Sequence, residues 1–122
     1  MPFILTREIS SILFYDRVGD DSMNWDFEVL TDKDISEVKR LVNEYSIFVG
    51  DQRIGIKIYI DENGLYQMKT SHFYQGKNNS GAYISTAAIF ETEQEALNRA
   101  KNQLLAFYDG QGMWHENDDY FI

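Results

Sequence analysis

The sequence contains no cysteine and a single proline among its 122 residues. The lack of cysteine excludes disulfide frameworks, thiolate metal sites, cysteine nucleophiles and iron–sulfur clusters. Long apolar runs are also lacking. Arg7 and Glu8 interrupt the first, and the next, residues 12–15, is far shorter than the roughly 20 residues that span a bilayer. We therefore expect no secretion signal, no membrane segment and a cytoplasmic location.

The sequence also has few candidates for chemistry. It contains no phosphate-binding loop, dinucleotide fingerprint, nucleophile elbow or zinc-protease helix. His72 falls in an aromatic-flanked strand pattern, which is typical of a partly buried structural residue. His115 lies in a polar run without the ligand spacing that a metal site shows. We therefore expect no enzymatic activity, no catalytic residue, no cofactor and no metal.

What the chain has in excess is negative charge, with twenty acidic and eleven basic residues and a net charge of −9. The charge is concentrated in two stretches. Residues 16–34 hold seven acids and two bases, and residues 109–122 hold four acids and no base. An acidic surface repels nucleic acids and anionic membranes and attracts basic proteins, although acids can also serve solubility alone.

The first half of the chain gives mixed signals. Residues 3–15 fit a short helix by spacing and a strand by their β-branched content, and both alternatives stay open. Trp25, Phe27 and Val29 alternate with polar residues, which predicts a half-buried strand. A helix is then predicted from Thr31 or Asp32 to just before Gly50, because apolar residues recur at spacings of three and four. These apolar residues are Ile35, Val38, Leu41, Val42 and Tyr45.

The second half gives clearer signals. Isoleucines at every second position over residues 54–60 predict a strand, the sequence Asp-Glu-Asn-Gly over 61–64 predicts a turn, and residues 65–75 predict the returning strand. A third strand over residues 82–90 would complete a meander. Thr92 and Glu95 form a capping-box pattern before an apolar face that extends to about Tyr108. Gly110 is then expected to end this helix.

Together these elements predict a single α+β domain over residues 1–122, with residues 109–122 as an acidic, aromatic tail. Its antiparallel sheet would contain the three-strand meander and at least one further strand. Two amphipathic helices would pack on one face of the sheet and bury its isoleucines.

The predicted run of one helix, three strands and a second helix, residues 33–108, resembles the element order of double-stranded-RNA-binding domains. The meander and the following residues 90–96 are similar to DNA readers of the AP2 type. The first resemblance implies lysines at the start of the last helix, whereas this chain has Glu91, Glu93 and Glu95 there. Carboxylates at a helix N-terminus repel an anion. Direct nucleic-acid binding is therefore only the second alternative.

In size, charge and lack of motifs the chain resembles bacterial immunity proteins that neutralise nuclease toxins, and acidic phage inhibitors that mimic DNA. That resemblance implies a non-catalytic inhibitor of a basic, nucleic-acid-acting protein. We expect the chain to be a monomer or a homodimer. Aromatic residues make up 15% of the chain, and Tyr and Trp are common anchors at interfaces. The expected partner-binding residues, for steering charge and anchors, are Asp20, Asp21, Asp26, Glu28, Asp32, Asp34, Trp114, Asp118, Asp119 and Tyr120.

The first alternative is an accessory domain that binds a small ligand or a subunit and associates with itself. It would use the polar and aromatic face of the meander. The residues expected on that face are Tyr66, Thr70, His72 and Tyr74.

Overall fold

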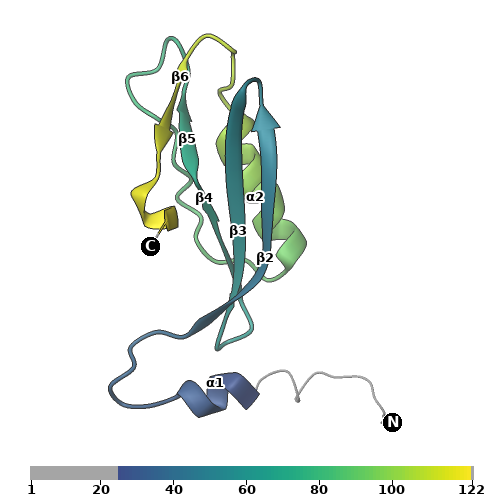
Figure 1. The fold of residues 1–122 in the computed structure, drawn as a ribbon, viewed down its shortest axis with the longest axis vertical. Coiled ribbons are helices and arrows are strands. Elements are labelled where there is room, and N and C mark those ends of the chain that lie inside the picture. The colour runs from purple at the N-terminus through teal and green to yellow at the C-terminus, as the bar shows by residue number, and fades with distance from the viewer. Residues whose placement is uncertain (1–24, 122) are drawn as a thin grey trace, which may run out of the picture. The chain divides into compact units, whose positions relative to one another are not determined.

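The structure is a computed structural model that describes residues 25–121 (Figure 1). The alternatives left open for residues 3–15 lie outside the described residues. The chain divides into two units, of which the first ends at Val38 and the second begins at Lys39. Each unit is described by itself.

In the first unit, the strand predicted around Trp25 is wrong, because Trp25–Leu30 forms the short helix α1. The alternation does not match burial, since Phe27 is buried while Trp25 and Val29 are exposed. Acidic residues in the first turn favour a helix start, and the Asp26 carboxylate accepts a hydrogen bond from the Phe27 N–H at 2.9 Å. At the other end, the Thr31 hydroxyl donates to the Phe27 carbonyl at 2.8 Å.

The helix predicted from Thr31 or Asp32 to Gly50 is also wrong. Lys39–Val49 forms strand β2, which pairs antiparallel with β3, Gln52–Asp61. A two-residue turn joins the strands, and Gly50 takes a φ of +58° there rather than at a helix end. Pairing with ten residues of β3 satisfies the backbone of a segment rich in β-branched and aromatic residues, which outweighs the helical spacing.

The central strand β3 confirms its sequence prediction. Ile54, Ile56 and Ile58 are buried on one face of the sheet, and each contributes about 1.5–3 kcal/mol of hydrophobic stabilisation. The predicted turn follows, with the Gly64 N–H donating to the Asp61 carbonyl at 3.1 Å. The antiparallel order β2-β3-β4, with β4 at Tyr66–Thr70, completes a three-stranded sheet.

The strand predicted over residues 65–75 is divided at Ser71. After β4 the chain continues as β5, His72–Gln75, which pairs with β6, Met113–Glu116, in a separate two-stranded antiparallel sheet. The Ser71 N–H donates to the Gly55 carbonyl at 2.9 Å, so that Ser71 ties the division to β3. The sheet of β2, β3 and β4 therefore has no further strand within residues 25–121, and β6 of the tail pairs with β5 instead.

The strand predicted over residues 82–90 is wrong, because this segment is irregular apart from an isolated bridge between Phe90 and Tyr66. Hydrogen bonds to the side chain of Gln103 connect this segment to β4 in place of backbone pairing between strands. The carbonyl oxygen of Gln103 accepts the Ser85 N–H at 2.9 Å, while its amide nitrogen donates to the Thr70 hydroxyl at 2.7 Å. Gln103 is buried, and these two bonds satisfy its amide.

Helix α2, Glu93–Leu105, is confirmed with its predicted cap, since the Thr92 hydroxyl accepts the Glu95 N–H at 3.1 Å. It ends before the predicted Tyr108. Its buried residues join the isoleucines of β3 in one core, with Ala96, Ala100 and Leu104 fully buried. The second of the two predicted helices is β2, so in the second unit α2 alone packs on the sheet. Figure 1 shows α2 behind β2 and β3, and the opposite face of the sheet is called the outer face below.

Candidate functional site: the docked acidic tail

The expected partner-binding residues fall into two groups in different units. Asp20 and Asp21 lie outside the described residues. Asp26 and Glu28 lie on α1, and Asp32 and Asp34 follow in a turn that is closed by the Ile35 N–H donating to the Asp32 carbonyl at 3.0 Å. The remaining four lie on β6 and on the 3₁₀ helix η3, Asp118–Phe121. A single partner-binding surface made of both groups, as the expected residues imply, stays a prediction.

The tail of the second unit is folded onto the outer face of the sheet through Tyr120. This side chain is only 6% exposed, and its hydroxyl donates to the Glu44 carboxylate on β2 at 2.7 Å. Gly55 makes room for it, because a Cβ at this position would lie 2.1 Å from the Tyr120 hydroxyl oxygen. Burial and the hydrogen bond to Glu44 raise the pKa of Tyr120, so that the phenol stays protonated as the donor.

Two lysines of the sheet hold the backbone of the tail. The Lys57 ammonium donates to the Tyr120 carbonyl at 2.7 Å and lies 4.2 Å from the centre of its ring. The Lys69 ammonium donates to the Asp119 carbonyl at 3.2 Å. Both cations therefore bind carbonyl oxygens near the C-terminal end of η3, where the helix dipole favours positive charge.

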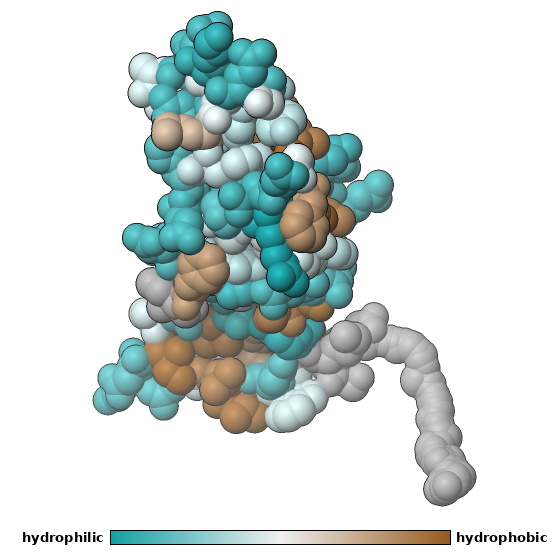
Figure 2. Space-filling model, turned by 45° about the horizontal axis from the view of Figure 1, so that its top comes forward, coloured by the Kyte–Doolittle hydropathy of each residue, from teal (hydrophilic) through white to brown (hydrophobic). Residues whose placement is uncertain are grey.

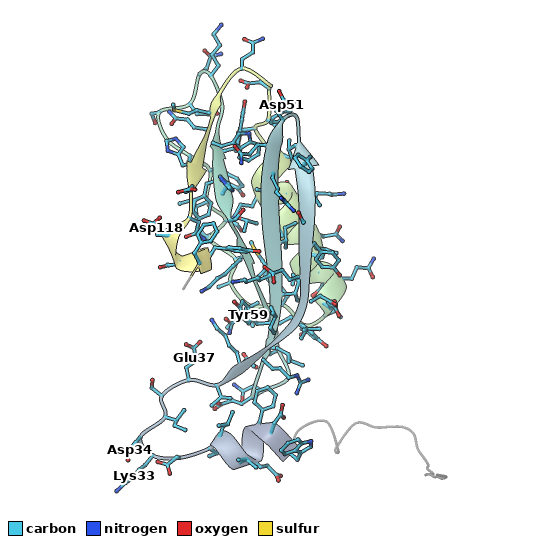
Figure 3. The ribbon with its side chains drawn as sticks, in the orientation of Figure 1. Lys33, Asp34, Glu37, Asp51, Tyr59 and Asp118 are labelled. Atoms are coloured by element: carbon cyan, nitrogen blue, oxygen red, sulfur yellow. The ribbon has the colours of Figure 1, made fainter. Side chains whose placement is uncertain are left out.

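As a result, the two aspartates of η3 keep free carboxylates. Asp118 and Asp119 are exposed, and neither carboxylate has a hydrogen bond or ion pair to any residue within 25–121. Figure 3 shows Asp118 on the side of η3 that is turned away from the sheet. The tail thus presents a pair of anionic groups on an ordered backbone.

The two expected anchors are mostly inside the fold. Tyr120 is buried, and Trp114 is half-buried against the core. The aromatic side chain of η3 that does project is Phe121, which is 62% exposed. Its ring meets that of Tyr120 edge-on, with the ring centres 5.1 Å apart. Phe48 on β2 is another exposed aromatic side chain, at 67%, and neither was among the expected partner-binding residues. The position of Phe48 directly before Val-Gly-Asp-Gln, a hairpin signal, could have placed it in a strand.

A groove of about 410 Å³ lies beside Phe121 on the outer face of the sheet, and Arg53 and His72 contribute to its lining. The Arg53 side chain donates to the Ser46 hydroxyl at 3.2 Å. The groove is thus lined by the Arg53 guanidinium, the His72 imidazole, the Glu44 carboxylate and the ring of Phe121, among others.

The alternative ligand face is divided between the interior and the surface. Thr70 and Tyr74 are buried, while Tyr66 and His72 are half-buried. Tyr66 and Thr70 belong to the three-stranded sheet, whereas His72 and Tyr74 belong to the two-stranded one. These four side chains are therefore not brought together on one accessible surface.

Ser71 and His72 form a pair that resembles a nucleophile and its base, with the Ser71 hydroxyl 2.7 Å from His72 Nδ1. The same hydroxyl accepts the Gly55 N–H at 2.8 Å, and Ser71 is only 3% exposed. Burial lowers the pKa of His72, against a smaller opposing effect of the Glu116 carboxylate. The pair links β3, β4 and β5 where the two sheets meet, and both residues also contribute to the lining of the groove beside Phe121.

Asp109 closes the other end of the tail onto the two-stranded sheet. Its carboxylate accepts the Tyr74 hydroxyl at 2.6 Å and the N–H groups of Lys77 and Gln111 at 2.8 and 2.9 Å. These donors, the Tyr74 hydroxyl above all, hold the pKa of Asp109 far below its ordinary value of 3.8. Asp109 is therefore a structural carboxylate, unlike Asp118 and Asp119.

The hydrogen bonds to the Asp109 carboxylate predict a contribution to stability that is lost in acid. Because the folded-state pKa is depressed, the stabilisation is complete above the ordinary value of 3.8 and is lost as the pH falls below it. Asp109→Asn should lower the free energy of unfolding at pH 7 and should flatten its decline between pH 4 and pH 2. Urea titrations at a series of pH values measure both effects. A decline as steep as that of the parent protein would contradict the assignment.

Within residues 25–121, no three histidine, aspartate or glutamate side chains are grouped so that they could hold a metal ion. No helix in this part of the chain has the length and apolarity needed to cross a membrane. Comparison of the chain with family models, curated proteins and solved structures finds no match.

Proposed function

We propose that this chain is a non-catalytic binding protein of the inhibitor or immunity type, which docks a basic, nucleic-acid-acting protein. The observation that carries the proposal is the pair of free carboxylates of Asp118 and Asp119 on a tail whose backbone is held by Lys57 and Lys69. A preordered anionic surface loses little conformational entropy on binding, and its charge speeds encounter with a cationic partner.

The exposed Phe121 next to these carboxylates supplies an apolar contact, and the adjacent groove gives a partner side chain a place to enter. This combination of an aromatic anchor and a charged rim is common at protein interfaces. We therefore assign the anchoring role to Phe121 in place of Tyr120, whose ring is buried.

The same contacts weigh against direct nucleic-acid binding through the sheet. The resemblance to AP2-type readers would place the contacting bases on the outer face. Two of the lysines there already donate to carbonyls of the tail, and the carboxylates of Asp118 and Asp119 would repel phosphates.

The proposal predicts salt-dependent association with a captured partner. Between 50 and 300 mM NaCl the association rate constant should fall about tenfold or more, because ions screen the steering charge. At 50 mM NaCl, the double variant Asp118→Asn and Asp119→Asn should associate about five- to tenfold more slowly than the parent protein. Stopped-flow or surface plasmon resonance measurements give these rates.

The matched control neutralises two exposed acids elsewhere in the second unit, Glu62→Gln in the turn between β3 and β4 and Glu91→Gln before α2. It changes the net charge by the same amount, and its association rate should stay within a factor of two of the parent. If the control associated as slowly as the tail variant, the tail would contribute only through the net charge of the protein. That result would contradict the proposal.

A further inference from the structure

A hollow of about 340 Å³ lies where the tip of the β2–β3 hairpin meets the loop between α2 and β6. One side is formed by the hairpin turn at Gly50 and Asp51, and the other by Gly110 and Gly112 of the loop. Figure 1 shows the hairpin tip and this loop at the same end of the sheet, and Figure 3 shows Asp51 at the tip. In Figure 2 the surface at the end that comes forward is mostly hydrophilic.

Three aromatic rings line this hollow. The rings of Tyr108 and Trp114 lie at 30° to each other, with their centres 6.0 Å apart. The Tyr74 ring is tilted against both, with its centre 4.9 Å from that of Tyr108 and 4.7 Å from that of Trp114. The faces of phenol and indole rings carry negative potential and attract cations. Tyr108 is 38% exposed and Trp114 is half-buried, so these two rings are accessible to a ligand.

Two carboxylates strengthen this potential from different sides. Asp109 accepts the Tyr74 hydroxyl at 2.6 Å and so shifts electron density toward the Tyr74 ring. Asp51 contributes to the lining itself, is exposed, and has no hydrogen bond or ion pair from its carboxylate to any other described residue. No lysine or arginine contributes to the lining.

The backbone keeps the hollow open. A Cβ at Gly50, whose φ is +58°, would lie 2.9 Å from the Tyr108 hydroxyl, and Gly110 has a φ of +73°. Side chains at these two positions would strain the backbone and fill the space between hairpin and loop. The glycines thus let the aromatic rings and Asp51 share one opening.

We propose that this hollow binds an alkylammonium group, with the rings of Tyr108 and Trp114 against the cation and the Asp51 carboxylate opposite its charge. The shared chemistry is that of a lysine or methylated lysine side chain and of a free quaternary amine such as choline. Binding of a lysine side chain from a basic protein partner rests on the proposed function, whereas binding of a free quaternary amine does not. A neutral group of the same shape would gain neither the ring potential nor the carboxylate.

The test uses the fluorescence of Trp114 in a Trp25→Phe variant, which leaves a single tryptophan in the chain. The probes are choline, its neutral analogue 3,3-dimethylbutan-1-ol, and the lysine model compound N-acetyl-lysine methylamide. Choline and the lysine compound should change the emission saturably, with dissociation constants in the millimolar range. The neutral analogue should bind at least about tenfold more weakly, as expected for a cation–π site that is partly desolvated.

Variants then assign the binding to the proposed groups. Asp51→Asn should weaken choline binding about three- to tenfold, whereas Glu62→Gln, which removes one charge at the other hairpin turn, should leave it unchanged. Tyr108→Leu should weaken it about tenfold. Tyr108→Phe keeps the ring and should retain binding within a factor of three, which separates loss of the site from loss of folding.

Three outcomes would overturn the proposal: no saturable change in emission, equal affinity for choline and its neutral analogue, or equal weakening by Asp51→Asn and Glu62→Gln. Binding of choline without the lysine compound would keep the cation site and exclude a protein side chain as its source. Since the tail variant at Asp118 and Asp119 leaves the hollow intact, its association rates test the proposed function separately from this site.

Discussion

Gly112→Ala is expected to cost about 3 kcal/mol or more of the free energy of unfolding. A Cβ at this position would lie 1.9 Å from the Gln75 carbonyl oxygen and 2.9 Å from its carbon, both of which are backbone atoms. Neither can rotate away, so the loop or β5 must shift. Such a shift breaks the pairing of Gln75 with Met113 and the bond from the Gly112 N–H to the Tyr74 hydroxyl.

Urea unfolding followed by far-UV circular dichroism measures this loss, which is large against the 5–15 kcal/mol of a typical domain. Gly81→Ala is the matched control, because a Cβ there meets no atom within 4 Å. It should change the stability by less than about 0.5 kcal/mol. If Gly112→Ala were as stable as Gly81→Ala, the close approach of the loop to β5 would be refuted.

The elements that could be predicted from the sequence are those specified by neighbouring residues. Helix α2 follows from its Thr92 cap and an apolar face in one continuous segment. Strand β3 follows from isoleucines at alternate positions, and its turn follows from a four-residue signal that ends in Gly64. In these places local preference and tertiary environment agree.

Strand β2 shows where spacing alone misleads. Apolar residues at intervals of three and four fit a helix, but Leu41 is exposed, while Tyr45 and Ile47 pack against the core from a strand. The β-rich run before Gly50 and Asp51, followed by the alternating isoleucines, was the competing hairpin pattern. Tertiary pairing with β3 decides between the two, and it does not appear within a short window of sequence.

The irregular segment before α2 is not specified by its neighbouring residues. Its position depends on Gln103, whose amide links Ser85 to Thr70 from 18 and 33 residues away. A buried glutamine on a helix face that is otherwise apolar is the only trace of this contact in the sequence. The strand predicted over residues 82–90 to complete the meander could not take this contact into account.

For the candidate site, the sequence supplied the acidic residues of the tail but could not supply their setting. Tyr120 fits against Gly55, a glycine 65 positions earlier that alternates with the isoleucines of β3. This long-range fit turns the expected aromatic anchor into a core residue. It leaves Phe121 exposed and gives the two aspartates an ordered backbone.

The contact between α2 and the sheet predicts the second large effect. Leu104 is fully buried and packs in one cluster with Ile54 and Ile58 of β3. Leu104→Ala should lower the free energy of unfolding by about 3–4 kcal/mol, because it removes buried methyl groups and leaves a cavity that a helix packed on a sheet cannot fill. The midpoint of urea unfolding should fall accordingly, with little change in its slope.

The adjacent Leu105 makes a matched control, since it lies on the same helix and is 42% exposed. Leu105→Ala changes the same side chain with the same effect on helix propensity, and should cost less than about 1 kcal/mol. The difference between the two variants therefore reports the burial of Leu104 in the core between α2 and the strands. Equal losses of stability would mean that α2 does not pack Leu104 against the isoleucines. They would contradict the placement of α2 on the sheet, which defines the opposite, outer face to which the tail is attached.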